Sequence, residues 1–291
     1  MRSWQAGRDW PKPCSRRPDE RAVMAPALSC DCHIHVFAAT DALERSAEAY
    51  RALQRRLGLS RAVVVQASAY GFDNRVTLAA IAALGAADTR GTAIVARDVS
   101  DAELTRLTEG GIRGARLHVM PNWMLAWEDV APIADRIAAF GWHVQLQMDG
   151  ALLPEREAAL RRLPTPVVID HLGKFLQPVT VADDCFQSVL RLLDTGRVWF
   201  KLSAGYEISR SGPPGYEDVS ALAIAAIRHA PERMLWGSNW PHIGVPVAPD
   251  DAGELDLLRQ WVPDAAVRHR ILVENPAAFY GFDQPKAVAA R

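Results

Sequence analysis

Histidines in two distant segments are the residues of this chain best suited to chemistry. His33 and His35 lie one residue apart in the segment CDCHIHVF, and His171 follows much later in VVIDHLGK. Asn239 lies in a third segment, WGSNWPH. A neutral imidazole can polarise a carbonyl group, exchange a proton with water or bind a metal ion. We therefore predict His33, His35, His171 and Asn239 as the catalytic residues.

Alternation along the first of these segments predicts which of its residues face the site. Successive side chains of a strand point to opposite faces, so we expect Asp31 on the same face as His33 and His35. Cys30 and Cys32 then fall on the other face. There we expect them to pack under helices as small buried hydrophobes and not to hold a metal cluster.

Polar residues at two other predicted strand ends are candidates for binding a substrate. They are Ser68 and Tyr70 after the second predicted strand, and Arg116 and His118 at the end of the fourth. The guanidinium of an arginine can bind a carboxylate through two parallel hydrogen bonds. A surface ion pair is the alternative role for Arg116.

Two lysines and two tryptophans have more than one interpretation. Lys174 and Lys201 lie near the sixth and seventh predicted strands, and pairing or solvation accounts for them as well as a place in the site does. Trp123 and Trp127 follow the fourth predicted strand, where they either wall the site or pack a loop against the fold.

Short strand-like runs alternate with helical stretches along the whole chain. The predicted strands are residues 29–37, 62–68, 92–99, 115–120, 143–149, 166–172, 198–203 and 234–238. The predicted helices are residues 42–57, 74–86, 101–109, 127–140, 151–163, 183–193, 218–229, 251–261 and 265–280.

This alternation is typical of a parallel α/β fold, and eight strand–helix units favour a closed (β/α)8 TIM barrel in a single domain. Functional residues of that fold lie at the carboxyl ends of the strands, where the candidates above are found. The alternative is a doubly wound sheet. It is disfavoured because no GxGxxG turn follows the first predicted strand.

Length and charge limit the classes of partner. A chain of 291 residues suits one such barrel, which we place at residues 26–284. With 34 acidic and 33 basic residues, nothing suggests nucleic acid or a membrane as a partner. A small molecule is the expected ligand, and the oligomeric state stays open.

The chain ends and the cysteines bear on the compartment. We interpret residues 1–25, rich in arginine and proline, as a flexible extension without the apolar stretch of a secretory signal, and residues 285–291 as a tail. Met24 is an alternative start. Four cysteines without a CxxC pair predict a reduced, cytoplasmic setting.

The HxH motif, the segment DHLGK and the segment WGSNWPH together resemble the amidohydrolase superfamily. The segments VVVQASAYGFDN, GIRGARLHV, WFKLSAGYE and ILVENPAAFYGF are similar to the branch that contains 2-pyrone-4,6-dicarboxylate lactonase and sugar-acid lactonases. The resemblance spans roughly residues 28–282. It implies histidine-assisted attack of water on a lactone, with Arg116 matching an arginine that binds a substrate carboxylate.

Two departures from the family pattern leave alternatives open. The family usually carries an aspartate general base where this chain has Asn239, and an amide cannot accept that proton. Either Asn239 is an introduced change, or another group such as His171 is the base, or hydrolysis is impaired. Lactone isomerisation and ligand binding without catalysis are therefore alternative functions. The second departure is a short first connection, from which we expect a more open pocket.

Metal-dependent members of the superfamily add a lysine or glutamate from strand four and a histidine from strand five. Here the strand-five histidine, His143, begins its strand, at the wrong end of a barrel. A metal would have only His33, His35 and His171, with no acidic ligand evident. We therefore expect no cofactor, and a Zn²⁺-dependent or other divalent-metal hydrolase or decarboxylase is the alternative.

Overall fold

Eight parallel strands form one sheet whose spatial order follows the chain, from β1 to β8. The computed structural model describes residues 24–121 and 123–283. An isolated parallel bridge between Ile34 and Trp240 joins β1 to the segment after β8 and brings the two ends of the sheet together. The strands are β1 (Cys30–Ile34), β2 (Arg61–Val65), β3 (Thr89–Ala93), β4 (Ile112–His118), β5 (His143–Gln147), β6 (Val167–Ile169), β7 (Val198–Leu202) and β8 (Met234–Trp236).

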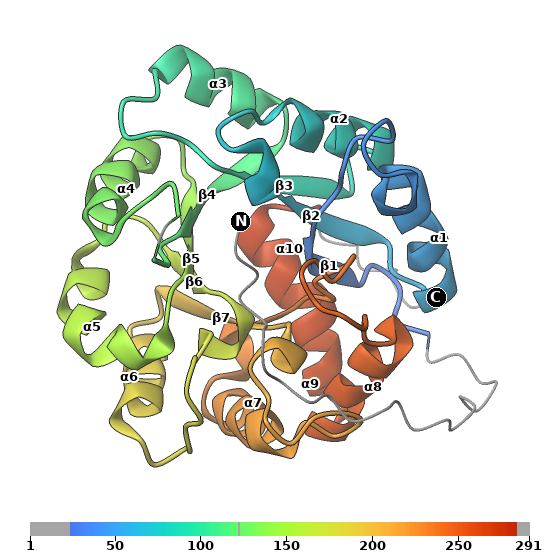
Figure 1. Cartoon of the computed structure of the whole chain (residues 1–291), viewed down its shortest axis with the longest axis vertical. Helices are drawn as coiled ribbons and strands as arrows, with labels where there is room; N and C mark the ends of the chain where they lie inside the picture. Colours follow the sequence, from blue (N-terminus) through green and yellow to red (C-terminus); the bar gives the residue numbers. More distant parts are fainter. Residues whose placement is uncertain (1–23, 122, 284–291) are drawn as a thin grey trace, which may run out of the picture.

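Figure 1 shows most of the helices around the outside of the strands and the last one, α10 (Asn275–Tyr280), at the centre of the view. The helices are α1 (Ala47–Leu57), α2 (Arg75–Leu84), α3 (Asp101–Glu109), α4 (Val130–Ala138), α5 (Leu153–Arg162), α6 (Asp184–Leu193), α7 (Glu217–His229), α8 (Asp251–Trp261), α9 (Ala265–His269) and α10. The predicted single-domain (β/α)8 barrel is confirmed. Among the described residues, no helix combines the length and apolarity that a bilayer span requires.

Two apolar layers hold the barrel together. Between strands and helices, residues such as Val64, Ala115 and Leu146 belong to one large buried cluster. A second cluster inside the barrel contains Val63 and Val168 and includes aromatic residues from the end of α10. This apolar cluster fills one end of the barrel interior. The polar side chains inside the barrel lie at the other end, where the strands have their carboxyl ends.

The first strand contains an irregularity that corrects one prediction. Asp31 pairs with Ala62 and Ile34 with Val64, so three steps along β1 match two steps along β2. Such a β-bulge interrupts the alternation of side chains. The expectation that Asp31 shares a face with the two histidines is therefore wrong.

The contacts of the residues around the bulge show that Asp31 points outward, away from the histidines, and that Cys30 and Cys32 point inward. Asp31 lies toward α1, where its Oδ2 accepts a hydrogen bond of 3.2 Å from the hydroxyl of Tyr50. Cys30 and Cys32 lie in the cluster inside the barrel, close to Tyr280, and not under the helices as predicted. Their role as small buried hydrophobes stands, because both are fully buried free thiols.

The connection after β1 is longer than predicted. The helix expected from residue 42 begins at Ala47, because Ser46 caps it by accepting a hydrogen bond from the backbone N–H of Ala49. A separate 3₁₀ turn, Leu43–Arg45, precedes it. The predicted extension, residues 1–25, falls outside the described residues except for its last two positions, and the predicted tail, residues 285–291, lies wholly outside them.

Candidate active site

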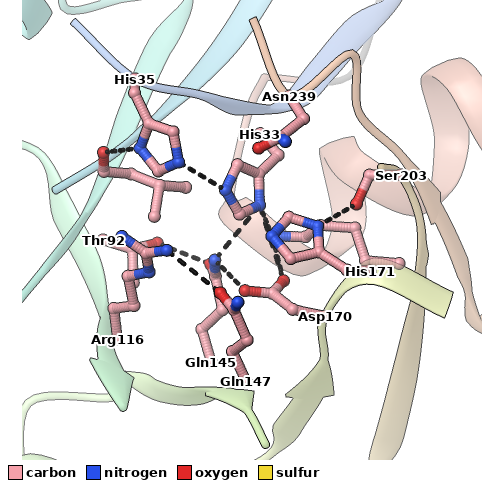
Figure 2. Close-up of polar contacts among 12 residues, drawn as sticks. His33, His35, Thr92, Arg116, Gln145, Gln147, Asp170, His171, Ser203 and Asn239 are labelled. Atoms are coloured by element: carbon pink, nitrogen blue, oxygen red, sulfur yellow. Dashed lines mark hydrogen bonds and ion pairs between the residues drawn. The ribbon is translucent and has the colours of Figure 1, made fainter. Parts of the chain in front are cut away.

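The carboxyl ends of the strands bring the predicted histidines into one cluster (Figure 2). His33 belongs to β1, His35 follows it directly, and His171 lies in the 3₁₀ turn after β6. The ring centroid of His33 is 4.9 Å from that of His35 and 4.6 Å from that of His171. All three side chains are buried.

Hydrogen bonds fix the protonation of the first two imidazoles. His35 Nδ1 lies 2.9 Å from the carbonyl oxygen of Val65, so it carries a hydrogen and leaves Nε2 as an acceptor. His33 Nε2 lies 3.2 Å from that acceptor and therefore carries a hydrogen itself. The lone pair of His33 is then on Nδ1. Burial, reinforced by Arg116, lowers the pKa of His35 to about 3, so the imidazole of His35 is neutral.

A buried ion pair between Lys201 and Asp170 lies beside His33. Pairing was one of the roles left open for Lys201, but Asp170 was missed from the sequence. The ammonium of Lys201 is 3.1 Å from Asp170 Oδ1 and 3.4 Å from His33 Nδ1. The other oxygen of Asp170 accepts a hydrogen bond of 2.8 Å from Gln145 Nε2. Burial alone raises the pKa of Asp170, but Lys201, His171 and Arg116 outweigh it and hold the pKa below its usual value. Asp170 is therefore a carboxylate.

The segment after β6 holds His171 in an unusual backbone conformation. His171 and Leu172 have φ values of 52° and 51°, a left-handed conformation that costs a non-glycine residue on the order of 1 kcal/mol. His171 Nδ1 lies 2.9 Å from the hydroxyl of Ser203, which fixes the ring. Burial, followed by the neighbouring His33, lowers the pKa of His171 well below its ordinary value. Strain of this kind is typical of functional sites.

Arg116 lies inside the barrel and not in a surface ion pair. Its guanidinium donates to the carbonyl oxygen of Gln66 at 2.8 Å, to the hydroxyl of Ser68 at 3.3 Å and to Gln147 Oε1 at 3.1 Å. Within residues 24–121 and 123–283 it has no acidic partner, and its Nε has no hydrogen-bond acceptor. A buried guanidinium held by neutral acceptors keeps its full charge for an anionic ligand.

The other predicted binding residues lie at the rim. Tyr70 is engaged by the first connection, because its hydroxyl donates to Asp41 Oδ2 at 2.6 Å and accepts from the backbone N–H of Ala38. His118 stacks on Trp123 with ring centroids 3.8 Å apart. Burial and then Arg116 lower the pKa of His118 to about 2.

Lys174 and Trp127, whose roles the sequence left open, lie outside the histidine cluster. Lys174 forms an ion pair with Glu207. The ring of Trp127 packs under the guanidinium of Arg156, 4.6 Å from the ring centroid, so it serves packing.

Asn239 is buried and joined to a network that the sequence did not indicate. Its Nδ2 donates to the hydroxyl of Tyr206 at 2.8 Å and to Glu207 Oε1 at 3.0 Å. Its Oδ1 has no partner among the described residues. The Tyr206 hydroxyl lies 2.9 Å from His242 Nδ1, and His242 Nε2 lies 2.9 Å from Asp251. The amide is thus a donor here, and it cannot act as a general base.

A metal ion does not fit this cluster as the residues stand. His33, Asp170 and His171 bring ligand atoms within 4.8 Å of one another, a group that includes Asp170 in place of the predicted His35. His33 Nδ1 is 3.6 Å from Asp170 Oδ1, and the Lys201 ammonium is close to both. An ion bonded to both atoms at about 2.1 Å would lie within about 4 Å of that ammonium. Their repulsion would be on the order of 8 kcal/mol at an effective dielectric constant of about 20.

Comparisons with known proteins identify the family to which this fold belongs. A model of the Amidohydrolase family matches residues 30–282. A D-galactarolactone isomerase from Agrobacterium fabrum is 36% identical over 82% of each chain. A 2-pyrone-4,6-dicarboxylate hydrolase from Comamonas testosteroni is 34% identical over 90% of this chain and 93% of its own.

A solved structure shares the fold and is also related in sequence. An apo crystal structure of an Agrobacterium tumefaciens protein superposes with a TM-score of 0.84 at 32% identity, covering 90% of this chain and 98% of that protein. The match of the family model over nearly the whole described barrel is the decisive finding. This chain belongs to the amidohydrolase family.

Proposed function

We propose that this protein opens a lactone that carries a carboxylate group, by adding water to the ring ester. The carrying observation is the buried Arg116, which has no acidic partner among the described residues and lies at the strand ends near the neutral histidines. Arg116 and Lys201 are cations and Asp170 is the one anion among these three buried groups, so together they leave one positive charge. Such a centre favours an anionic ligand.

The residues suggest a division of roles. Arg116 binds the carboxylate of the substrate through a bidentate hydrogen bond. His171 is the base: with Nδ1–H donating to Ser203, its Nε2 is free to accept a proton from water. The lowered pKa of His171 keeps it in the neutral form that this step requires. The hydroxyl of the water joins the carbonyl carbon, and the proton is passed to the ring oxygen as it leaves.

The positive charges help where negative charge develops. As water attacks, the carbonyl oxygen becomes an oxyanion, and fixed cations in a dry site stabilise it more than they stabilise the neutral ester. Arg116 and Lys201 are both buried and held by hydrogen bonds or ion pairs. We infer that this reaction needs no metal, because Lys201 already neutralises Asp170.

Asn239 favours a second candidate, lactone isomerisation. An amide at this position removes one base for water, and a relative that is 36% identical is a D-galactarolactone isomerase. In that reaction a hydroxyl group of the substrate attacks the carbonyl carbon in place of water. The ring oxygen leaves as a hydroxyl, so no water is consumed.

A panel of lactones tests both candidates. Each carboxylate-bearing lactone is paired with its uncharged amide, and products are followed by NMR in H₂¹⁸O. Hydrolysis places one solvent oxygen in the product, whereas isomerisation places none. Arg116→Met is expected to raise KM about 100-fold for the carboxylates only. No turnover of any lactone, or an equal effect of the variant on both series, contradicts the proposal.

We also propose that residues 26–284 form the functional barrel unit and that the protein works in the cytoplasm. The free thiols of Cys30, Cys32 and Cys185 support a reduced setting. Non-reducing and reducing peptide maps of protein isolated from cells test this, and a disulfide among these cysteines would count against it.

A further inference from the structure

We propose that the buried ammonium of Lys201 is the resident cation of this site. In place of a divalent metal, it neutralises Asp170 and holds the lone pair of His33 on Nδ1. The proposal deepens the lactone-opening function. It depends on that function only for the identity of the reaction, and not for the position or the effect of Lys201. Lys201 touches no reacting atom and is therefore a positioning residue: besides the effect of its charge on the oxyanion, it sets the proton positions of the histidine pair through its contacts with His33 and Asp170.

The position of Lys201 is the first argument. It belongs to β7, and its side chain has no exposed surface. Its Nζ, His33 Nδ1 and Asp170 Oδ1 form a triangle with sides of 3.1, 3.4 and 3.6 Å. A long, strongly hydrated cation is rarely buried completely unless it has paired partners. Here the partners are the same two atoms that would ligate a metal.

The donor set is the second argument. Two imidazoles and one carboxylate are a set of ligands found in catalytic zinc sites. In this chain those groups are His33, His171 and Asp170, all buried. An ammonium against two of the three therefore competes for the same atoms. The site thus has a complete set of zinc ligands, but a lysine ammonium already occupies the position where the metal would bind.

Proton positions are the third argument. An ammonium can only donate, so Lys201 requires the lone pair of His33 to be on Nδ1. His33 Nε2 then donates to His35 Nε2, and His35 Nδ1 donates to the carbonyl oxygen of Val65. One cation thus sets the direction of hydrogen bonds through both rings. Gln145 Nε2, at 3.5 Å from His33 Nδ1, is a more distant donor.

Removal of the ammonium gives a direct test. Lys201→Met keeps a side chain of similar length without the charge and frees His33, Asp170 and His171. We expect this variant to bind one equivalent of Zn²⁺ at least 100-fold more tightly than the wild type in calorimetric titrations at one pH. Co²⁺ bound to it should give the absorption of a four-coordinate site. Lys201→Arg, which keeps the charge, should gain no affinity.

Two outcomes would overturn the proposal. One is a folded Lys201→Met protein that binds Zn²⁺ no more tightly than the wild type. The other is a wild type that itself binds one equivalent of Zn²⁺ tightly. The double variant Lys201→Met with Asp170→Asn should lose the gained affinity, which ties the metal to this cluster and not to a surface site.

A measurement on the wild type covers the case in which Lys201→Met does not fold. Histidine ¹⁵N shifts in labelled protein report which ring nitrogen carries the hydrogen. We expect His33 to carry it on Nε2 and to have a bare Nδ1, and the opposite assignment would overturn the proposal. Neither the zinc titration nor the NMR spectrum needs a substrate, so a failure here is distinct from a failure of the lactone assay.

Discussion

A carboxylate introduced at position 239 should make hydrolysis faster than in the wild type, but only at alkaline pH. In the wild type, Asn239 Nδ2 lies 3.0 Å from Glu207 Oε1. Asn239→Asp replaces that donor with an acid oxygen at the same distance. Two unit negative charges about 3 Å apart repel by on the order of 5 kcal/mol at an effective dielectric constant of about 20. This corresponds to an upper limit of about 4 pKa units, which the Lys174 ammonium on Glu207 reduces.

The sign of the effect follows from the repulsion. Two carboxyl groups so close share one proton, and the pair loses it only at raised pH. Since the base is the ionised form, kcat for hydrolysis of Asn239→Asp should rise as the pH is increased from 6 to 10, by about tenfold or more above wild type. Because the raised pKa belongs to the folded state, ionisation opposes folding, and the variant should lose stability as the pH rises from about 4, the ordinary pKa of an aspartate, through the raised pKa.

A second substitution isolates the cause. Asn239→Asp combined with Glu207→Gln removes the repulsion, so the rise in kcat should move down by about 2 pH units or more. Rates are measured in a pH-stat with incorporation of ¹⁸O as the check on hydrolysis. A double variant whose profile coincides with that of Asn239→Asp would refute the coupling. A double variant no faster than the wild type at any pH would refute position 239 as a place for the base.

Three further predictions concern the base, the bulge and metal ions. His171→Asn should lower kcat about 100-fold with little change in KM, and Ser203→Ala about tenfold, in steady-state assays; equal effects on KM would point to binding instead. Burial raises the pKa of Asp31 to about 6, although Ser238 and Tyr50 donate to it, so its contribution to stability is present below pH 4 and is lost as the pH rises through 6. The unfolding free energy of the wild type should therefore fall relative to Asp31→Asn by about 3 kcal/mol over that range in urea titrations, and parallel curves would contradict this. Dialysis against a chelator should leave kcat within about twofold of the untreated enzyme, and loss of activity restored by Zn²⁺ would contradict a metal-free reaction.

The barrel and the histidine cluster could be predicted because their signals are local. Alternating strand-like and helical runs indicate the fold, and strand ends indicate where the site is. His33, His35 and His171 were found in this way, and the structure brings them together. Arg116 was found by the same rule, and it lies in the interior.

Features that depend on pairing between distant segments could not be predicted. The bulge in β1 reverses the orientation of Asp31, and a register shift against β2 leaves no mark in the sequence of β1. Asp170 stands directly before His171, but its importance comes from Lys201 on the next strand. The partners of Asn239 lie in the turn after β7, which sequence alone does not place beside it.

The central claim is that a carboxylate-bearing lactone is bound between Arg116 and the histidine cluster at the carboxyl ends of the strands. A crystal structure with the ring-opened product of the best substrate tests it most directly. We predict that one product carboxylate accepts hydrogen bonds from the Arg116 guanidinium and that the newly formed carboxylate lies within hydrogen-bond distance of His171 Nε2. A product bound at any other part of the barrel, with Arg116 still held only by its neutral neighbours, would contradict the account.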